Sequence, residues 1–152
     1  MKRVIIFSLI AITFAACKKN KTTTPTVQPA NKIAGKWNII SVNVIPRDST
    51  GKAINNGTIY IEPSYYYFKF NNDNSWVENL GPDPAISLGE SGSYVLHADT
   101  SFTLINVNLQ SEPEECKITS ITATSFVFSH QKATLFNGVT PGYLEYLFKL
   151  KK

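Results

Sequence analysis

The sequence is poor in cysteine, with two among 152 residues, which excludes the dense disulfide framework of many small secreted domains. Cys116 alternates with Ile118 in a strand-like stretch, and this predicts a small buried hydrophobe, not a reactive thiol. No amphipathic helical segment is present, because apolar residues nowhere recur at intervals of three and four. These absences leave a domain built from strands around an apolar core.

The chain also lacks a basic face. The formal net charge is +4, but Lys2, Arg3, Lys18, Lys19 and Lys21 all lie near the N-terminus. Without these five, ten basic residues remain against eleven acidic ones. A nucleic-acid binder needs clustered basic side chains to displace counterions from phosphates, so we expect no nucleic-acid partner.

The usual signatures of catalysis are missing as well. There is no His-Glu-x-x-His, no Gly-x-Ser-x-Gly and no phosphate-binding glycine loop. His97 and His130 lie far apart in the sequence, near predicted strand ends. Glu112, Glu114 and Glu115 form the only carboxylate cluster, which we interpret as solvated loop charge, with a weak calcium site as the alternative. We therefore predict no catalytic residues, no metal, no cofactor and no enzymatic activity.

What the sequence does have is an export signal at its start. Lys2 and Arg3 are followed by an apolar run over residues 4–14 and by the small residues Ala15 and Ala16. This order is typical of a leader peptide, and the run is shorter than the ~20 residues that span a bilayer. We predict that residues 1–16 are removed. A retained membrane anchor is the alternative.

The residues at the cleavage point, Phe14-Ala15-Ala16-Cys17, resemble the lipobox of bacterial lipoproteins. The resemblance implies that Cys17 becomes the N-terminus and carries lipid, such as palmitate, which holds the protein on a membrane. An ordinary secretory leader with an unmodified Cys17 is the alternative. In lipoproteins, Lys18 in place of Asp after the cysteine favours the outer membrane. The absence of acidic residues up to Lys21 favours the leaflet that faces the periplasm.

A flexible tether is predicted for residues 17–31, which contain two prolines and almost nothing that could pack. From residue 32 to 152, short segments rich in β-branched and aromatic residues alternate with turn residues. The predicted strands are 36–45, 57–62, 65–70, 75–78, 93–98, 101–107, 115–121, 125–130 and 143–151, and 80–89 is a predicted loop. Such a series predicts an all-β domain, an eight- to nine-stranded antiparallel up-and-down barrel, with a β-sandwich as the alternative.

Several stretches of this domain resemble the lipocalin-like domains of Gram-negative bacterial lipoproteins. They are Gly35-Lys36-Trp37, Phe68-Lys69-Phe70-Asn71-Asn72-Asp73-Asn74-Ser75-Trp76, Glu90-Ser91-Gly92-Ser93-Tyr94-Val95-Leu96 and the strand over 145–149. The resemblance covers residues 33–152 and implies a barrel with Gly35 and Trp37 at its closed base, below a calyx. Asn74 replaces the usual glycine of the hairpin turn, and asparagine tolerates the left-handed conformation that a tight turn requires.

A dense group of aromatic residues is the candidate ligand site. Tyr66, Phe68 and Phe70 fall on one face of their predicted strand. With neighbours on other strands they form either an ordinary core or the lining of a calyx. The candidate calyx residues are Tyr66, Phe68, Phe70, Trp76, Tyr94 and Phe148. We expect a membrane-anchored protein that binds a small apolar or amphipathic molecule. A structural lipoprotein that contacts another envelope protein is the alternative.

Overall fold

The computed structural model describes residues 31–83, 89–98, 100–107 and 112–152, and in them every regular element is a β-strand. The predicted leader, the lipidation site Cys17, nearly all of the tether and the middle of the predicted 80–89 loop lie outside the described residues. The strands are β1 (Gly35–Asp48), β2 (Thr58–Ile61), β3 (Tyr67–Phe70), β4 (Ser75–Asn79), β5 (Ser91–His97), β6 (Ser101–Asn106), β7 (Glu114–Ile121), β8 (Ser125–Phe136) and β9 (Thr140–Lys151).

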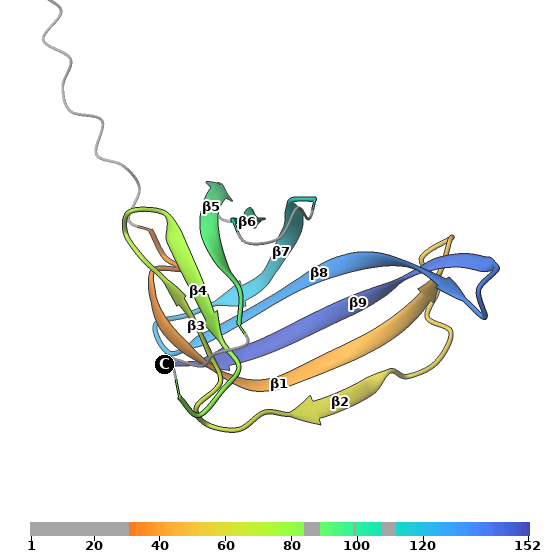
Figure 1. The fold of residues 1–152 in the computed structure, drawn as a ribbon, viewed down its shortest axis with the longest axis horizontal. Helices are drawn as coiled ribbons and strands as arrows, with labels where there is room; N and C mark the ends of the chain where they lie inside the picture. Colours follow the sequence, from red (N-terminus) through yellow and green to blue (C-terminus); the bar gives the residue numbers. More distant parts are fainter. Residues whose placement is uncertain (1–30, 84–88, 99, 108–111) are drawn as a thin grey trace, which may run out of the picture.

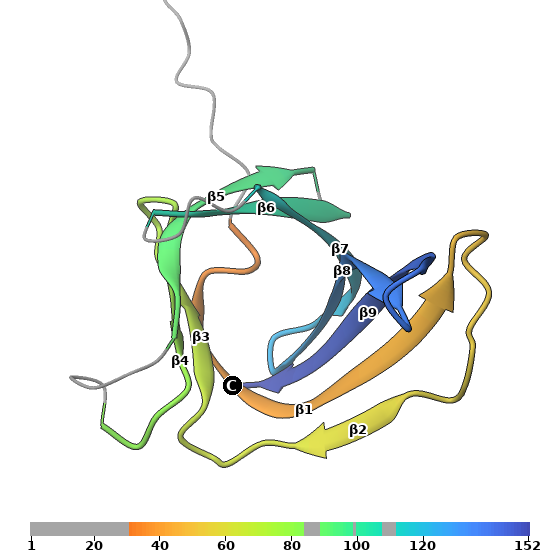
Figure 2. The same ribbon diagram turned by 45° about the vertical axis from the view of Figure 1, so that its right-hand side comes forward.

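Eight of these strands close into an antiparallel barrel. Each strand from β3 onward pairs with the next along the chain, and β9 returns to pair with β1. Figure 2 shows the resulting ring, with β2 outside it against β1. The ladders differ in length: β8 and β9 pair twelve residues, whereas β4 and β5 pair three. The predicted up-and-down, lipocalin-like architecture is confirmed, and the sandwich alternative is not what the chain adopts.

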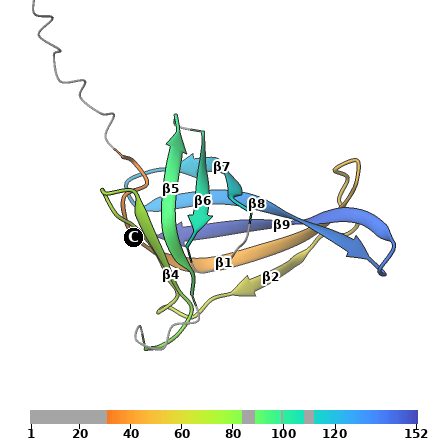
Figure 3. The same ribbon diagram turned by 45° about the horizontal axis from the view of Figure 1, so that its top comes forward.

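The ninth strand, β2, shares an edge of β1 with β3. β3 pairs with the start of β1, as in Asn38↔Tyr67, and β2 pairs further along, as in Ser41↔Ile61. The long strands β1, β8 and β9 run on beyond the ring together with β2, as Figures 1 and 3 show. In this extension β8 pairs with β9 as far as Phe136↔Thr140, while its pairing with β7 stops at Cys116↔His130.

The β8–β9 hairpin is longer than the sequence analysis predicts. The predicted strands stop at residue 130 and restart at 143, whereas the actual strands continue to Phe136 and from Thr140. Asn137 and Gly138 both have positive φ, 52° and 72°, and this pair forms the tip of the hairpin. Asn-Gly is the strongest short signal for a two-residue hairpin turn, so the sequence did contain the information.

A β-bulge in β1 explains why its apolar residues do not alternate cleanly. The register against β9 shifts between Ile39 and Ser41, and Ile40 is exposed at this point. Trp37 and Ile39 are buried before the shift and Val42 is buried after it, so the interior positions change phase by one residue. An extra residue in one strand has this effect because strand side chains alternate with a period of two.

Trp37 lies in the core at one end of the barrel, which we call the packed end. Its indole Nε1 donates a hydrogen bond to the Ile33 carbonyl at 2.7 Å, and its ring lies 5.4 Å from that of Phe126. The Lys152 ammonium sits 4.5 Å from the Trp37 ring centroid. The resemblance implies that Gly35 lies with Trp37 at the base of the barrel. Gly35 has a φ of +126°, a backbone conformation that residues with a side chain rarely adopt.

The hairpin between β3 and β4 turns through a polar loop. Asn74 has a φ of 64°, the left-handed conformation expected for it. The Asp73 carboxylate accepts hydrogen bonds from the Ser75 backbone at 2.9 Å and the Ser75 hydroxyl at 2.6 Å. These bonds lower the pKa of Asp73, with the Ser75 hydroxyl as the main cause. The turn is thereby fixed in one register, which places the aromatic residues of β3 and β4 on the same wall.

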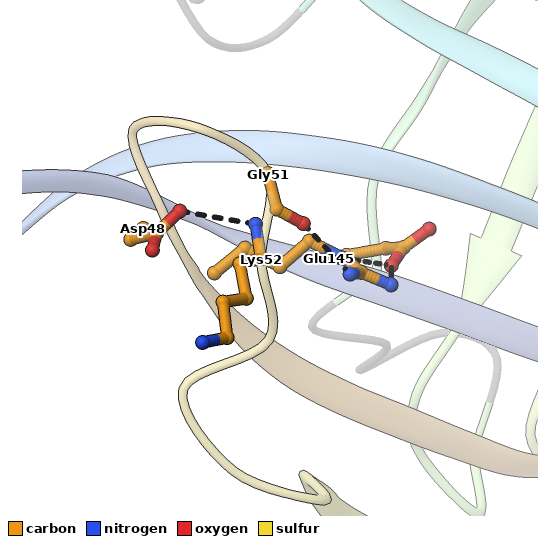
Figure 4. Close-up of polar contacts among 5 residues, drawn as sticks. Asp48, Gly51, Lys52 and Glu145 are labelled. Atoms are coloured by element: carbon orange, nitrogen blue, oxygen red, sulfur yellow. Dashed lines mark hydrogen bonds and ion pairs between the residues drawn. The ribbon is translucent and has the colours of Figure 1, made fainter.

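An ion pair ties the far end of β1 to β9. Arg47 Nε and Nη2 both lie 2.6 Å from Glu145 Oε2, and Arg47 Nη1 donates to the Gly51 carbonyl at 2.9 Å. The Asp48 carboxylate accepts a hydrogen bond from the Lys52 backbone at 3.0 Å. Figure 4 shows these contacts around the turn that follows β1. The extension beyond the ring is therefore fastened at its tip.

Candidate functional site

The interior of the barrel changes from apolar to polar along each strand. On β8 the interior residues run from Phe126 and Phe128, which are buried, to His130. On β4, Trp76 is followed by Glu78 on the same face, and on β7, Glu114 precedes Cys116 on the same face. The polar ends of these strands meet in space, so one end of the barrel is a packed aromatic core and the other carries charge.

The packed end is filled by side chains. The Phe70 ring makes edge contacts with Tyr94 at 5.4 Å and with Phe102 at 5.7 Å between centroids. Phe126 lies 6.0 Å from Phe102 and completes the layer with Trp37. Edge-to-face pairs of this kind add to the free energy of burial, and they leave little space between the rings.

A cavity of about 220 Å³ begins above this layer. Its apolar wall consists of Phe68, Trp76, Leu104, Tyr146 and Phe148. The Phe68 ring lies 5.5 Å from Phe148, and Phe148 is stacked 4.9 Å from Phe128. Its polar wall consists of Glu78, Glu90, Glu114, His130 and Lys132. The cavity therefore joins an aromatic floor to a charged mouth.

The candidate calyx residues divide between these two regions. Phe68, Trp76 and Phe148 line the cavity. Phe70 and Tyr94 belong to the packed layer below it, and Tyr66 is half-buried and packs against the core cluster. No residue of the polar wall is predicted from the sequence to belong to a ligand site.

Glu78 is held in a carboxylate-rich and largely dry environment. Burial raises its pKa to about 7, and the negative charges of Glu90, Glu114 and Glu62 add to the effect. A hydrogen bond from the Glu90 backbone acts in the opposite direction. Near neutral pH this carboxyl group is consequently divided between its protonated and ionised forms.

His130 and Glu114 do not form an ion pair at neutral pH. Their nearest atoms, Nδ1 and an Oε, are 3.6 Å apart, which is too long for a hydrogen bond. Burial lowers the pKa of His130 to about 4, with Lys132 as a second cause, so the imidazole is neutral. Burial also raises the pKa of Glu114, and repulsion from Glu90 contributes. The polar wall thus carries three glutamates against one described cation, Lys132, whose charge partly offsets the rise in the pKa of Glu114.

Two polar atoms in the cavity wall have no hydrogen-bond partner among the described residues. One is Nε1 of Trp76, a residue that is only 2 % exposed, and the other is Nδ1 of His130. Buried polar atoms are usually paired, because leaving one unpaired costs about 1–3 kcal/mol. Both residues line the cavity, and a ligand or water that reached either atom would remove this cost.

A larger open cleft of about 820 Å³ adjoins the cavity where β7 diverges from β8. It is lined by residues of both strands and shares Glu114, His130 and Lys132 with the inner cavity. The polar mouth therefore leads outward into a wider space.

Glu114 corrects one interpretation made from the sequence. The sequence predicts solvated loop charge at Glu112, Glu114 and Glu115, but Glu114 opens β7 and is half-buried at the cavity. Glu115 faces the outside, where it accepts a hydrogen bond from the Thr103 hydroxyl at 2.7 Å. That hydroxyl also lies 2.7 Å from His97 Nε2. The period of two along the strand separates the two adjacent glutamates.

Cys116 is the buried hydrophobe that its alternation with Ile118 predicts. It is 1 % exposed and has a free thiol, and burial raises its pKa, with the charge of Glu114 as a second cause. A thiolate is therefore strongly disfavoured at this position. In the described part of the chain, no three His, Cys, Asp or Glu side chains converge in a way that could hold a metal ion.

Comparison with the models of known protein families and with curated proteins gives no match for this chain. Within residues 31–83, 89–98, 100–107 and 112–152 there is also no helix long and apolar enough to cross a membrane. The fold and the cavity therefore carry the functional argument. They define a small barrel of lipocalin-like architecture with a half-open cavity at one end.

Proposed function

We propose that this protein is a lipid-anchored lipoprotein of the outer membrane, facing the periplasm, whose lipocalin-like barrel binds a small apolar or amphipathic molecule. The observation that carries the proposal is the 220 Å³ cavity, in which Phe68, Trp76 and Phe148 adjoin charged residues. Ligand sites are typically concave and mainly apolar, with a few polar groups that orient the ligand. The anchor itself is supported by the residues around Cys17 in the sequence.

Native mass spectrometry tests the binding function. We would export residues 18–152 without the lipidated cysteine into the periplasm of a bacterial host and record the intact mass. The expected result is an added mass that is released on denaturation. It should be lost in a Trp76→Leu variant and kept in Val95→Ala, a control on the exposed outer face of β5. A clean mass, with no uptake from a panel of small apolar compounds, would contradict the function.

The anchor has a separate test. Cells would be labelled with an alkyne analogue of palmitate, and the label on the wild type would be compared with that on Cys17→Ala. We expect label on the wild type alone, in the outer-membrane fraction. Equal label on both proteins, or none on either, would contradict the assignment of Cys17. Protease treatment of intact cells tests the orientation, because a domain facing the periplasm resists digestion until the outer membrane is opened.

We infer a second candidate function, protein–protein contact in the cell envelope, from the exposure of β2. This edge strand presents Ile59, Tyr60 and Ile61 to solvent, and Ile61 is 78 % exposed. Unprotected apolar edge strands are sites for pairing with another chain. A photo-crosslinker at position 59 should then capture a partner of defined mass, whereas one at position 95 on β5 should not. No specific product at position 59 would remove this candidate.

A further inference from the structure

The charges at the cavity are unbalanced. Three carboxylates, those of Glu78, Glu90 and Glu114, line it, and Lys132 is the only ammonium group among its described lining residues. Lys132 is exposed, and the neutral His130 adds no positive charge. The carboxylates lie close enough that Glu90 disfavours ionisation of both of the others. A cation placed between them would relieve this repulsion.

The apolar wall limits what else the ligand carries. About 220 Å³ is less than the roughly 300–1,000 Å³ of pockets for drug-sized molecules, and more than the ~150 Å³ of an engineered cavity that accepts benzene. A single aromatic ring or a short alkyl group fits between these limits. The rings of Phe68, Trp76 and Tyr146 also attract a cation through their π faces.

The two unpaired polar atoms give an independent indication of a ligand. His130 Nδ1 makes no hydrogen bond among the described residues, although Glu114 Oε2 lies 3.6 Å away, and a neutral imidazole offers one nitrogen as an acceptor, which an N–H donor can satisfy. Stacking of the His130 ring on Tyr146 and Phe148, at 4.9 and 5.6 Å, holds that ring in place. The Trp76 Nε1–H requires an acceptor, either an oxygen on the ligand or a water bound with it.

We propose that the ligand is a small organic amine, whose ammonium group binds between the Glu78 and Glu114 carboxylates while its ring or alkyl group lies against Phe68, Trp76 and Phe148. This inference rests on the proposed binding function and narrows it to one ligand class. An anion of the same shape would meet three carboxylates, and a neutral analogue would leave their charges unpaired. Specificity therefore comes from the polar wall and affinity from the aromatic floor.

Three probes of similar shape and different charge test the proposal. They are 2-phenylethylamine, 2-phenylethanol and 3-phenylpropionate, which are respectively a cation, a neutral molecule and an anion at neutral pH. Each would be titrated by calorimetry at pH 8 into the full chain held in lipid nanodiscs, with empty nanodiscs as the blank. We expect the amine to bind at least tenfold more tightly than the alcohol, and the carboxylate to bind more weakly than either.

Adjacent residues on β7 supply the matched variants. Glu114→Gln should weaken amine binding at least fivefold and leave alcohol binding within twofold. Glu115→Gln, which changes the outward-facing neighbour, should leave both unchanged. Glu78→Gln, on β4, is a second test and should likewise weaken amine binding more than alcohol binding. Near-ultraviolet circular dichroism checks that each variant keeps its tertiary packing.

The outcomes separate this inference from the function on which it rests. If the alcohol or the carboxylate binds as well as the amine, and Trp76→Leu abolishes that binding, the barrel is a carrier but not for cations. If Ca²⁺ alone binds through Glu78 and Glu114 and the amine does not, the polar wall is a metal site and the amine proposal is overturned. If none of the three probes binds, both the amine proposal and a binding function for ligands of this size are overturned.

Discussion

The imidazole of His130 lies parallel to the phenol ring of Tyr146, with centroids 4.9 Å apart and planes 9° from parallel. The two residues are direct cross-strand partners on β8 and β9. This stacking keeps the imidazole at the inner wall, where burial holds it in the neutral form. His130 thus contributes a polar atom to the cavity without adding charge to it.

Glu78 and His130 should have opposite effects on stability across mildly acidic pH. The folded-state pKa of Glu78 is raised to about 7. Its stabilising contribution to the free energy of unfolding is therefore complete below the pKa of the unfolded chain, 4.5, and is lost as pH rises through 7. The folded-state pKa of His130 is lowered to about 4, so its contribution is complete above about 6.5 and is lost as pH falls to 4. Between pH 4.5 and 6.5 the two groups change the free energy of unfolding with pH by similar amounts in opposite directions, so their effects cancel.

Single substitutions should reveal the pH dependence of stability that each group contributes. In Glu78→Gln, the free energy of unfolding should increase with pH between 4.5 and 6.5 relative to the wild type, by up to about 1.4 kcal/mol per pH unit. In His130→Phe it should decrease with pH over the same range. Urea denaturation at half-unit pH steps measures both. Parallel pH profiles for the two variants would contradict the assigned pKa shifts.

Gly92 on β5 should not tolerate a side chain. A Cβ atom there would lie 1.8 Å from the Ile105 carbonyl oxygen and 3.0 Å from Trp76 Nε1, and the first of these is fixed backbone. We expect Gly92→Ala to lower the free energy of unfolding by about 1–3 kcal/mol, because overpacking forces the neighbouring strand to move. Ser93→Ala, at the next and exposed position, is the control, and an equal loss in both would refute the steric explanation.

The Arg47–Glu145 ion pair should contribute modestly to stability and more to local order. Both side chains are partly buried, 27 % and 19 % exposed, so salt screens the pair less than it would a fully exposed one. Glu145→Gln should cost about 1 kcal/mol and speed hydrogen exchange in the turn after β1. Lys149→Gln, an outward-facing change on the same strand, should do neither.

Cys116 should react only when the protein unfolds. Its thiol is buried and its pKa is raised by that burial, so the thiolate is scarce in the folded state. In a Cys17→Ser variant, alkylation by iodoacetamide should be slow in buffer and should accelerate with urea along the unfolding curve. Rapid labelling of the folded protein would show that the β6–β7–β8 wall opens locally.

Local patterning predicts the architecture and three residues of the apolar cavity wall, Phe68, Trp76 and Phe148, because inward-facing aromatic residues follow the period of a strand. It does not separate these three from Phe70 and Tyr94, which belong to the packed layer. The polar wall is not predicted, for a different reason. The position of Glu114 beside Glu112 and Glu115 indicates loop charge, although Glu114 shares the face of Cys116, which is predicted to be buried. Glu78 shares the face of Trp76 in the same way. Which strands bring these carboxylates together depends on barrel closure, a long-range property that alternation alone does not contain.

The unequal ladders imply an uneven resistance to opening around the barrel wall. Amide protons along the twelve-residue β8–β9 ladder should exchange with solvent last, whereas the three-residue β4–β5 ladder can part with few broken bonds. That short ladder adjoins the Glu78–Glu90 backbone contact at the polar wall. The wall at this ladder should therefore open locally at a lower free-energy cost than the long β8–β9 hairpin, which would keep the rest of the barrel folded.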